Sequence, residues 1–331
     1  MGNSKTLIRV QNLRVQFHIP QGIVRAVDGV DFEIGKGKSL GIVGESGCGK
    51  SITALSLMLL HPQPEGKIAG GKIVYYPQDA PPVDITSLDI YGQDIRKIRG
   101  KDIAMIFQEP MTSLSPVYTI GQQIVEAIQL HQHLNKKEAR ELAIDSLDQV
   151  KISAPSQRVN EYPHQMSGGM RQRAMIAMAL SCKPALLIAD EPTTALDVTI
   201  EAQILGLIKE LQEENGMSLL IITHDLGVVG EMADYVTVMY VGRIVERAPV
   251  KELFENPLHP YTRVLFRSLP KIGSRQRLSS IPGSVPSPYQ LPHGCSFKGR
   301  CEEIEDACRD ESPQPCMVDG DHLVYCWKYF K

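Results

Sequence analysis

The chain contains the stretch Gly44-Glu45-Ser46-Gly47-Cys48-Gly49-Lys50-Ser51, which has the pattern G-x-x-x-x-G-K-S. A short apolar run, 38–43, precedes it, and a helical pattern, 51–60, follows it. Strand, glycine-rich loop and helix form the context in which this pattern binds phosphate. The glycines allow backbone N–H groups to surround phosphate oxygens without a clash from a Cβ atom. The sequence therefore predicts a nucleotide site in which Lys50 contacts the β- and γ-phosphates and Ser51 binds Mg²⁺.

The composition limits the classes of function. The chain has 331 residues, enough for two domains, with 35 Lys and Arg residues against 38 Asp and Glu. This near-neutral balance, without a long basic run, does not favour a nucleic-acid partner. No apolar run reaches the length of a membrane span, and no signal-peptide pattern follows Met1. We therefore expect a soluble, cytoplasmic chain that reaches a membrane only through a partner.

Strand patterns precede the glycine-rich loop. Runs of alternating apolar and polar residues lie within 6–40 and are separated by turn signals, which predicts an antiparallel sheet. Phe17 lies in one of these runs, and its ring has two interpretations. It stacks on an adenine base, as aromatic faces do, or it is an ordinary core residue. The local pattern does not separate the two.

An acidic pair ends another apolar run. Residues 184–189 are mostly apolar and lead into Asp190 and Glu191. Two neighbouring carboxylates at the end of a buried strand are costly without a cation. We expect Asp190 to hold Mg²⁺, directly or through water, and Glu191 to accept a proton from the water that attacks the γ-phosphate.

Two further strand patterns end in polar residues. The apolar run 103–107 is followed by Gln108, and the run 218–223 is followed by His224. Ligands bind beyond the carboxyl ends of strands in open α/β sheets, and a histidine there is able to hydrogen-bond a γ-phosphate. Taken alone, however, each residue is better explained by a structural role.

A helical insertion is predicted from about residue 111 to 180. Its apolar positions have a helical period from 119 to 150, and Asn135 with Glu138 predicts a capping box. Near the end of the insertion, Ser167-Gly168-Gly169-Met170 opens a further helix. This helix start is either an anion-binding nest or a simple cap by its serine, and the local sequence favours the cap.

These motifs occur in the order that is typical of one protein family. The chain is similar, over essentially its whole length, to the ATP-binding subunits of ABC transporters. The motifs that carry the resemblance are the loop 44–51, Gln108, Ser167-Gly168-Gly169, the strand and acidic pair 188–191, Asp197 and His224. Further stretches resemble the oligopeptide/dipeptide importer subfamily: 108–114, 162–173, 256–262, Gly294-Cys295 and Arg300-Cys301.

The resemblance implies an α/β fold with a P-loop NTPase core. Added to the core would be an N-terminal antiparallel β subdomain, the helical insertion, and a small irregular cysteine-rich C-terminal extension. The ATP-binding domain would cover residues 1–255, and the extension would cover residues 256–331.

The resemblance also implies a head-to-tail sandwich of two such subunits around ATP. The implied ATP contacts are Phe17, which stacks on adenine, and Gly44, Glu45, Ser46, Gly47, Cys48, Gly49, Lys50, Ser51 and Ile52. The implied Mg²⁺ ligands are Ser51, Gln108 and Asp190. Glu191 would be the catalytic base, His224 would steady the γ-phosphate, and Gln108 would sense Mg²⁺ and the attacking water.

A second set of residues would act on the nucleotide of the partner subunit. The resemblance implies this role for the signature residues Ser167, Gly168, Gly169 and Met170, and it implies that Asp197 couples the two sites. Met170 replaces the Gln that is usual in the family, which leaves a ribose contact open.

The implied function is ATP hydrolysis that powers the import of di- and oligopeptides. The implied partners are a second ATPase subunit (a related chain rather than a second copy), two integral membrane permease subunits and, indirectly, an extracytoplasmic solute-binding protein. The helical insertion and the loop after Gln108 would dock the permease, at the cytoplasmic face of the membrane. Import of nickel or another solute is one alternative. A soluble ABC ATPase is a second alternative, but such proteins usually have paired ATPase domains and this chain has one set of ATPase motifs. A cluster-binding regulator that binds nucleotide without hydrolysing it is a third, and the acidic pair argues against it.

Cysteines gather near the C-terminus. In a cytoplasmic protein, Cys295, Cys301, Cys308, Cys316 and Cys326 indicate metal or cluster chemistry before disulfides. The spacing of Cys295, Cys301, Cys308 and Cys326 resembles the tail of the importer subfamily, and the resemblance implies that these four thiolates hold a 4Fe–4S cluster. Zinc held by four thiolates is the main alternative, and unliganded thiols or a disulfide is another. Cys316 fits the spacing least.

Overall fold

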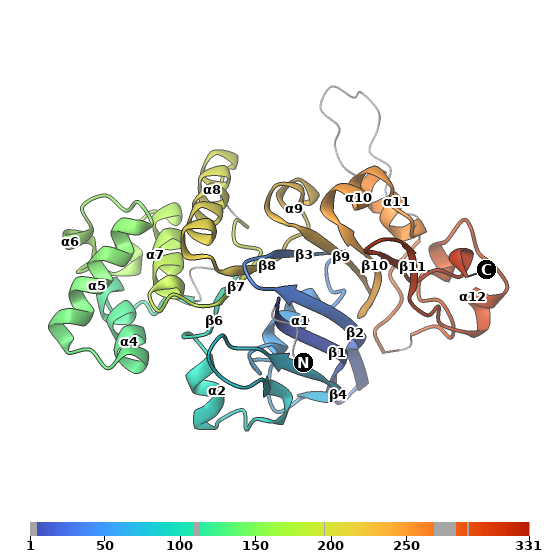
Figure 1. Ribbon diagram of the computed structural model, residues 1–331, viewed down its shortest axis with the longest axis horizontal. Coiled ribbons are helices and arrows are strands. Elements are labelled where there is room, and N and C mark those ends of the chain that lie inside the picture. The colour runs from blue at the N-terminus through green and yellow to red at the C-terminus, as the bar shows by residue number, and fades with distance from the viewer. Residues whose placement is uncertain (1–4, 109–112, 195, 268–282, 290, 331) are drawn as a thin grey trace. The chain divides into compact units, whose positions relative to one another are not determined.

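The computed structural model describes residues 5–108, 113–194, 196–267, 283–289 and 291–330 (Figure 1). The chain divides into two compact units. The first unit consists of Met1–Leu7, Gly35–Lys38 and Leu88–Ile221, and the second of Ile8–Ile34, Ser39–Ser87 and Ile222–Lys331. No helix in the described part of the chain is long and apolar enough to span a membrane.

Buried parallel strands form the centre of the first unit. They lie in the order β6 (Ile103–Ile106), β7 (Leu186–Asp190) and β8 (Ser218–Ile222). Every residue of these strands is buried, which is why the sequence shows continuous apolar runs instead of alternation. β6 and β7 are parallel neighbours, with Met105 opposite Ile188.

Helices make up most of the rest of the first unit. They are α2 (Gln93–Ile98), α4 (Ile120–Gln132), α5 (Lys136–Gln149), α6 (Pro155–Arg158), α7 (Gly168–Leu180) and α8 (Val198–Asn215), with a 3-10 turn at Pro163–Gln165. The capping box predicted from Asn135 and Glu138 begins α5, and Thr119 forms a second one at α4. The predicted start of the insertion, at about residue 111, and the predicted docking loop directly after Gln108 lie partly or wholly outside the described residues.

The second unit contains the predicted antiparallel sheet. Its strand order is β2 (Gly22–Gly35), β1 (Thr6–Ile19), β4 (Gly66–Tyr75) and β5 (Val83–Asp84). A 3-10 turn at Ile85–Ser87 follows β5. This sheet confirms the interpretation of the alternating runs before the glycine-rich loop.

Further strands of the second unit run from β3 to the end of the chain. β3 (Ser39–Val43) pairs in parallel with β9 (Tyr235–Tyr240), and the sheet continues antiparallel through β10 (Arg243–Pro249), β12 (His322–Val324) and β11 (Cys316–Asp319). The helices of this unit are α1 (Lys50–Ser56), α9 (Leu226–Met232), α10 (Val250–Glu255), α11 (Pro260–Arg267) and α12 (Ala307–Asp310), with 3-10 turns at Lys298–Arg300 and Trp327–Tyr329.

The C-terminal segment contains more regular structure than its Pro-rich composition indicates. The composition predicts an irregular extension, but β12 pairs with β10, and Glu246 lies opposite Val324 in the register. His322 and Val324 are both buried there. Three-residue and four-residue strands are too short for a clear alternation in the sequence, so their pairing depends on the strand that is already in place.

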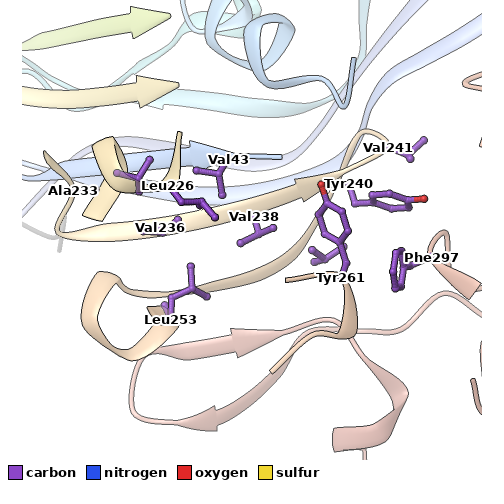
Figure 2. Close-up of a cluster of buried hydrophobic side chains, with 13 residues drawn as sticks. Val43, Leu226, Ala233, Val236, Val238, Tyr240, Val241, Leu253, Tyr261 and Phe297 are labelled. Carbon is purple, nitrogen blue, oxygen red and sulfur yellow. The ribbon is translucent and has the colours of Figure 1, made fainter. Parts of the chain in front are cut away.

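A buried cluster joins the C-terminal segment to β9 (Figure 2). Tyr240 of β9 packs on Tyr261 of α11, with ring centroids 4.7 Å apart, and on Phe297, with centroids 5.3 Å apart in an edge-to-face arrangement. All three rings are fully buried. Burial of each such ring is worth roughly 1.5–3 kcal/mol, so the C-terminal segment is part of the core of the second unit.

Candidate functional site

The glycine-rich loop lies between β3 and α1, as the sequence predicts. Gly44 and Gly49 have φ angles of +154° and +101°. A Cβ atom at Gly44 would lie 2.2 Å from the carbonyl oxygen of Met239, and one at Gly49 would lie 2.3 Å from that of Ala26. Only glycine fits at these two positions, so the backbone of the loop follows a path that other residues would block.

Lys50 lies inside this loop. Its ammonium group donates hydrogen bonds to the carbonyl oxygens of Gly44 at 2.8 Å and Glu45 at 3.1 Å. The side chain is buried, and a buried ammonium without partners would be costly. The loop thus gathers a positive charge and backbone amides in one place, and this arrangement fits a phosphate group.

Three further residues predicted to contact ATP lie in α1 and in β1. Ser51 and Ile52 are half-buried in α1. Phe17 is half-buried in β1 opposite Gly66, where a Cβ atom would lie 2.8 Å from the phenylalanine ring. Phe17 is therefore not one of the fully buried core residues, and its stacking on adenine stays a prediction.

The acidic pair lies at the end of β7 in the first unit. Asp190 is 5% exposed. Glu191 follows it with φ +47°, a left-handed backbone conformation that is uncommon for residues other than glycine. Such strain persists only where the surrounding structure imposes it, and it concentrates at functional sites.

Two side chains hold the carboxylate of Glu191. Gln108 Nε2 donates to Glu191 Oε2 at 2.9 Å, and Thr194 Oγ1 donates to the same oxygen at 3.0 Å. The structure thus brings together the predicted base and the predicted water sensor. Thr194 was not predicted, because nothing in the sequence beyond its place after the acidic pair distinguishes it.

Two other predicted site residues are N-caps of helices. Ser167 caps α7 by accepting a hydrogen bond from the backbone N–H of Met170 at 3.3 Å, and Asp197 caps α8 by accepting one from Ile200 at 3.0 Å. Ser167, Gly168 and Asp197 are exposed. The cap that the local sequence favours at Ser167 is therefore present. Contact of either helix start with a partner's nucleotide stays a prediction.

His224 lies in the second unit after β8, and it is exposed. The next residue, Asp225, caps α9 by accepting a hydrogen bond from Gly227 N–H at 2.7 Å. The structure thus places His224 at the end of a strand, as predicted, and its contact with a γ-phosphate stays a prediction.

The predicted cluster ligands lie in one part of the second unit. Burial raises the pKa of Cys295 and Cys301 and raises that of Cys326 to about 11, and the neighbouring cysteines contribute to each increase. Cys295 N–H also donates to the carbonyl oxygen of Cys308 at 2.9 Å. Cys295, Cys301 and Cys326 therefore lie near Cys308 and near one another.

Their arrangement, however, does not fit a metal ion. All seven cysteines are free thiols. The described residues contain no group of three or more His, Cys, Asp or Glu side chains that is placed to hold a metal. Cys316 lies in β11, where its Sγ is 3.4 Å from the carbonyl oxygen of Tyr329. The structure thus does not support the predicted 4Fe–4S cluster or its zinc alternative.

Comparison with known proteins identifies the family. The family model of ABC transporters matches residues 27–194, and that of the C-terminal region of oligopeptide/dipeptide transporters matches residues 245–308. The chain belongs to the ABC transporter family. This assignment confirms the resemblance that the motifs carry, and the second match covers much of the segment that contains Tyr261, Arg300 and the first three clustered cysteines.

Relatives of this ABC transporter chain match it over nearly its whole length. A probable peptide ABC transporter ATP-binding protein of Sinorhizobium fredii is 50% identical over 324 residues, which are 97% of this chain and 95% of the relative. The oligopeptide transport ATP-binding protein AppD of Bacillus subtilis is 51% identical over 325 residues, which are 98% and 97% of the two chains. A putative peptide import ATP-binding protein of Brucella melitensis is 48% identical over 330 residues, 98% and 97% of the two.

Solved structures of ABC cassettes share the fold. The ATP-binding cassette MJ0796, in a dimeric post-hydrolysis state bound to ADP and Pi, is 26% identical with a TM-score of 0.64, over 73% of this chain and 98% of the cassette. CbiO1 of Clostridium perfringens, part of the ABC transporter complex cbiONQ, is 27% identical with a TM-score of 0.61, over 76% and 92%. These likenesses confirm the P-loop NTPase fold of the ABC transporter chain.

Proposed function

We propose that this chain is the ATP-hydrolysing subunit of an importer of di- and oligopeptides. ATP and Mg²⁺ binding follow from its membership of the ABC ATPase family. The observation that carries hydrolysis is the hydrogen-bonded carboxylate of Glu191 beside Gln108. The names of relatives that are about half identical over the full chain support peptides as the solute.

The residues present have the chemistry that hydrolysis requires. Lys50 and Ser51 would hold the phosphates and Mg²⁺, and Asp190 would hold Mg²⁺ from its own strand end. Bound Mg²⁺ neutralises charge on the phosphate oxygens. Glu191 accepts the proton of the attacking water. Because Gln108 and Thr194 both donate to one oxygen of Glu191, they orient its carboxylate for this transfer.

The assembly is part of the proposal. The capped, exposed helix start at Ser167 would donate backbone N–H groups to the nucleotide of a second ATPase subunit, with Asp197 coupling the two sites. The helices α4 to α7 would dock two permease subunits at the cytoplasmic face of the membrane. Within the chain, residues 1–255 would form the ATP-binding domain and residues 256–331 the extension.

The solute is tested on the complex of this chain with its permease and binding protein, reconstituted in vesicles. ATP hydrolysis should rise when short peptides of mixed sequence are added, and nickel salts should leave it unchanged. Stimulation by nickel alone would replace the peptide assignment with the nickel alternative. Stimulation by RNA or ribosomes, without any membrane partner, would replace it with the soluble ATPase.

The 4Fe–4S cluster stays a separate hypothesis, which rests on the resemblance of the cysteine spacing to that of the importer subfamily. The spacing of Cys295, Cys301, Cys308 and Cys326 motivates it, and the lack of a ligating arrangement among the described residues counts against it. Metal analysis of anaerobically purified protein decides between the possibilities. Iron with visible charge-transfer absorption indicates a cluster, zinc without absorption indicates the thiolate site, and neither metal leaves free thiols.

A further inference from the structure

Two residues of the C-terminal segment hold Glu45, which lies inside the glycine-rich loop. Arg300 donates from Nη1 to Glu45 Oε2 at 2.7 Å and from Nη2 to Oε1 at 3.1 Å. The hydroxyl of Tyr261 accepts a hydrogen bond from the backbone N–H of Glu45 at 2.9 Å. All three residues belong to the second unit. The side chain and the backbone of Glu45 thus both hydrogen-bond to residues in the last third of the chain.

Arg300 and Tyr261 are themselves held in place by burial and by contacts with aromatic rings. The side chain of Arg300 is only 4% exposed, and its guanidinium lies 5.8 Å from the centre of the Tyr240 ring, with Nη1 3.3 Å from the Tyr240 hydroxyl. Tyr261 is fully buried, and its ring contacts the rings of Tyr240 and Phe297 (Figure 2). The two hydrogen bonds from the buried guanidinium of Arg300 to the carboxylate of Glu45 fix the position of both groups. Breaking either bond would leave part of a buried charge without a partner.

The inner side of the loop completes this arrangement. Lys50 Nζ binds the carbonyl oxygen of Glu45, while Tyr261 binds the N–H of the same residue. Glu45 is thus held from inside the loop by the lysine that would meet phosphate and from outside by the C-terminal segment. A loop that is ordered before its ligand arrives loses less conformational entropy when the ligand binds.

We propose that Arg300 and Tyr261 are positioning residues of the glycine-rich loop, through which the C-terminal extension sets the affinity of the chain for ATP. This inference rests on the proposed ATPase function and deepens it. Both residues act through Glu45, so their removal should weaken nucleotide binding without removing a group that touches the nucleotide.

The test is a double-mutant cycle on the full chain. Dissociation constants of Mg-ATP are measured for the wild type, Glu45→Gln, Arg300→Met and the double variant, together with the unfolding temperature of each. Each single substitution should weaken ATP binding about tenfold, which lies within the range typical of energetic coupling between two sites of a protein. The double variant should lose no more than either single one, because both remove the same contact. Arg300→Lys should recover only part of the affinity, since an ammonium group cannot form two parallel hydrogen bonds with a carboxylate.

Arg263→Met is the matched control. It removes an ion pair of similar length within the same extension, between Arg263 Nη2 and Glu303 Oε1 at 2.8 Å. It should therefore lower stability while leaving the contacts of Arg300 and Tyr261 with Glu45 unchanged. Its dissociation constant for ATP should equal that of the wild type. If Arg300→Met does not fold, Glu45→Gln and Tyr261→Phe carry the same test, since each leaves the buried side chain of Arg300 in place.

The outcomes separate the two proposals. Wild-type affinity in Glu45→Gln and Arg300→Met, with only a lower unfolding temperature, would show a purely structural ion pair and overturn the inference. Losses that add in the double variant would overturn it as well. Failure of the wild-type chain to bind ATP would instead overturn the proposed function on which the inference rests.

Discussion

Gln108 and Glu191 share a hydrogen bond of 2.9 Å, although they lie 83 residues apart in the chain. Gln108 lies shortly after β6 and Glu191 directly follows β7, and these strands are parallel neighbours whose carboxyl ends meet at one edge. Glu191 has a left-handed φ of +47°, so the extended conformation of β7 ends at Asp190. The resulting pair joins a carboxylate with an amide that is able to share a water molecule with it.

Replacement of Glu191 tests its role as the base. Glu191→Gln should lower ATP hydrolysis by about 10²–10⁴-fold, because the amide cannot accept the proton of water. ATP binding should persist, since the loop 44–51 is unchanged. Glu214→Gln, an exposed position on α8, is the control and should hydrolyse ATP at the wild-type rate. Near wild-type turnover by Glu191→Gln would remove the assignment.

The loop glycines differ in what a side chain would meet. Gly44→Ala places a methyl group 2.2 Å from the carbonyl oxygen of Met239, which should cost roughly 2–4 kcal/mol of stability and abolish ATP binding. At Gly47 no described heavy atom lies within 4 Å of the added Cβ, so Gly47→Ala carries only the cost of its φ of +77°, about 1–2 kcal/mol. Denaturant unfolding of both variants measures the difference. Equal costs would contradict the steric explanation.

His259 makes the stability of the chain depend on pH. Burial lowers the pKa of His259 from 6.5 to about 4; nearby Arg263 lowers it further, whereas Glu246 opposes the shift. Because the folded chain keeps this imidazole neutral while the unfolded chain protonates it, stability contributed by His259 is present above pH 6.5 and is lost as the pH falls from 6.5 towards 4. The loss should reach about 3 kcal/mol.

The substitution His259→Asn isolates this contribution. The asparagine side chain carries an oxygen that is able to accept the hydrogen bond now made by Tyr261 N–H to His259 Nδ1 at 3.1 Å. Urea unfolding at several pH values should show a shallower decline between pH 6.5 and 4 in the variant than in the wild type. Parallel declines would mean that other groups cause the acid sensitivity.

Assembly should appear as a concentration dependence. If the helix start at Ser167 completes the nucleotide site of a second subunit, an isolated copy should bind ATP but hydrolyse it slowly when dilute. Activity per chain should rise with protein concentration or with an added related subunit. Fast turnover that is independent of concentration would contradict the sandwich.

Much of the nucleotide-binding machinery follows from local sequence. The spacing of Gly44, Gly49 and Lys50 fixes a loop that few other residues could form. Buried parallel strands appear as apolar runs, so their ends, and hence Gln108 and Asp190, could be located. Helix caps such as Asn135 are visible because their hydrogen bonds span only three residues.

Other features depend on contacts between distant parts of the chain. Arg300 meets Glu45 across 255 residues, and no periodicity connects them. The pairing of β12 with β10 depends on a strand that is already in place, so the composition of the segment predicted less structure than is present. Thr194 has a recognisable place after the acidic pair, but its side chain meets Glu191 in a turn where its N–H also donates to the carbonyl oxygen of Glu191 at 3.2 Å, and the sequence does not show this turn.

ATP hydrolysis by this chain is expected to drive peptide import. The direct measurement is uptake of a radiolabelled short peptide by vesicles that contain the assembled transporter and enclose ATP on the ATPase side. Uptake should be ATP-dependent with the wild-type chain and with Glu214→Gln, and it should be lost with Glu191→Gln. Peptide accumulation that is the same with Glu191→Gln, or that does not require ATP, would contradict the account.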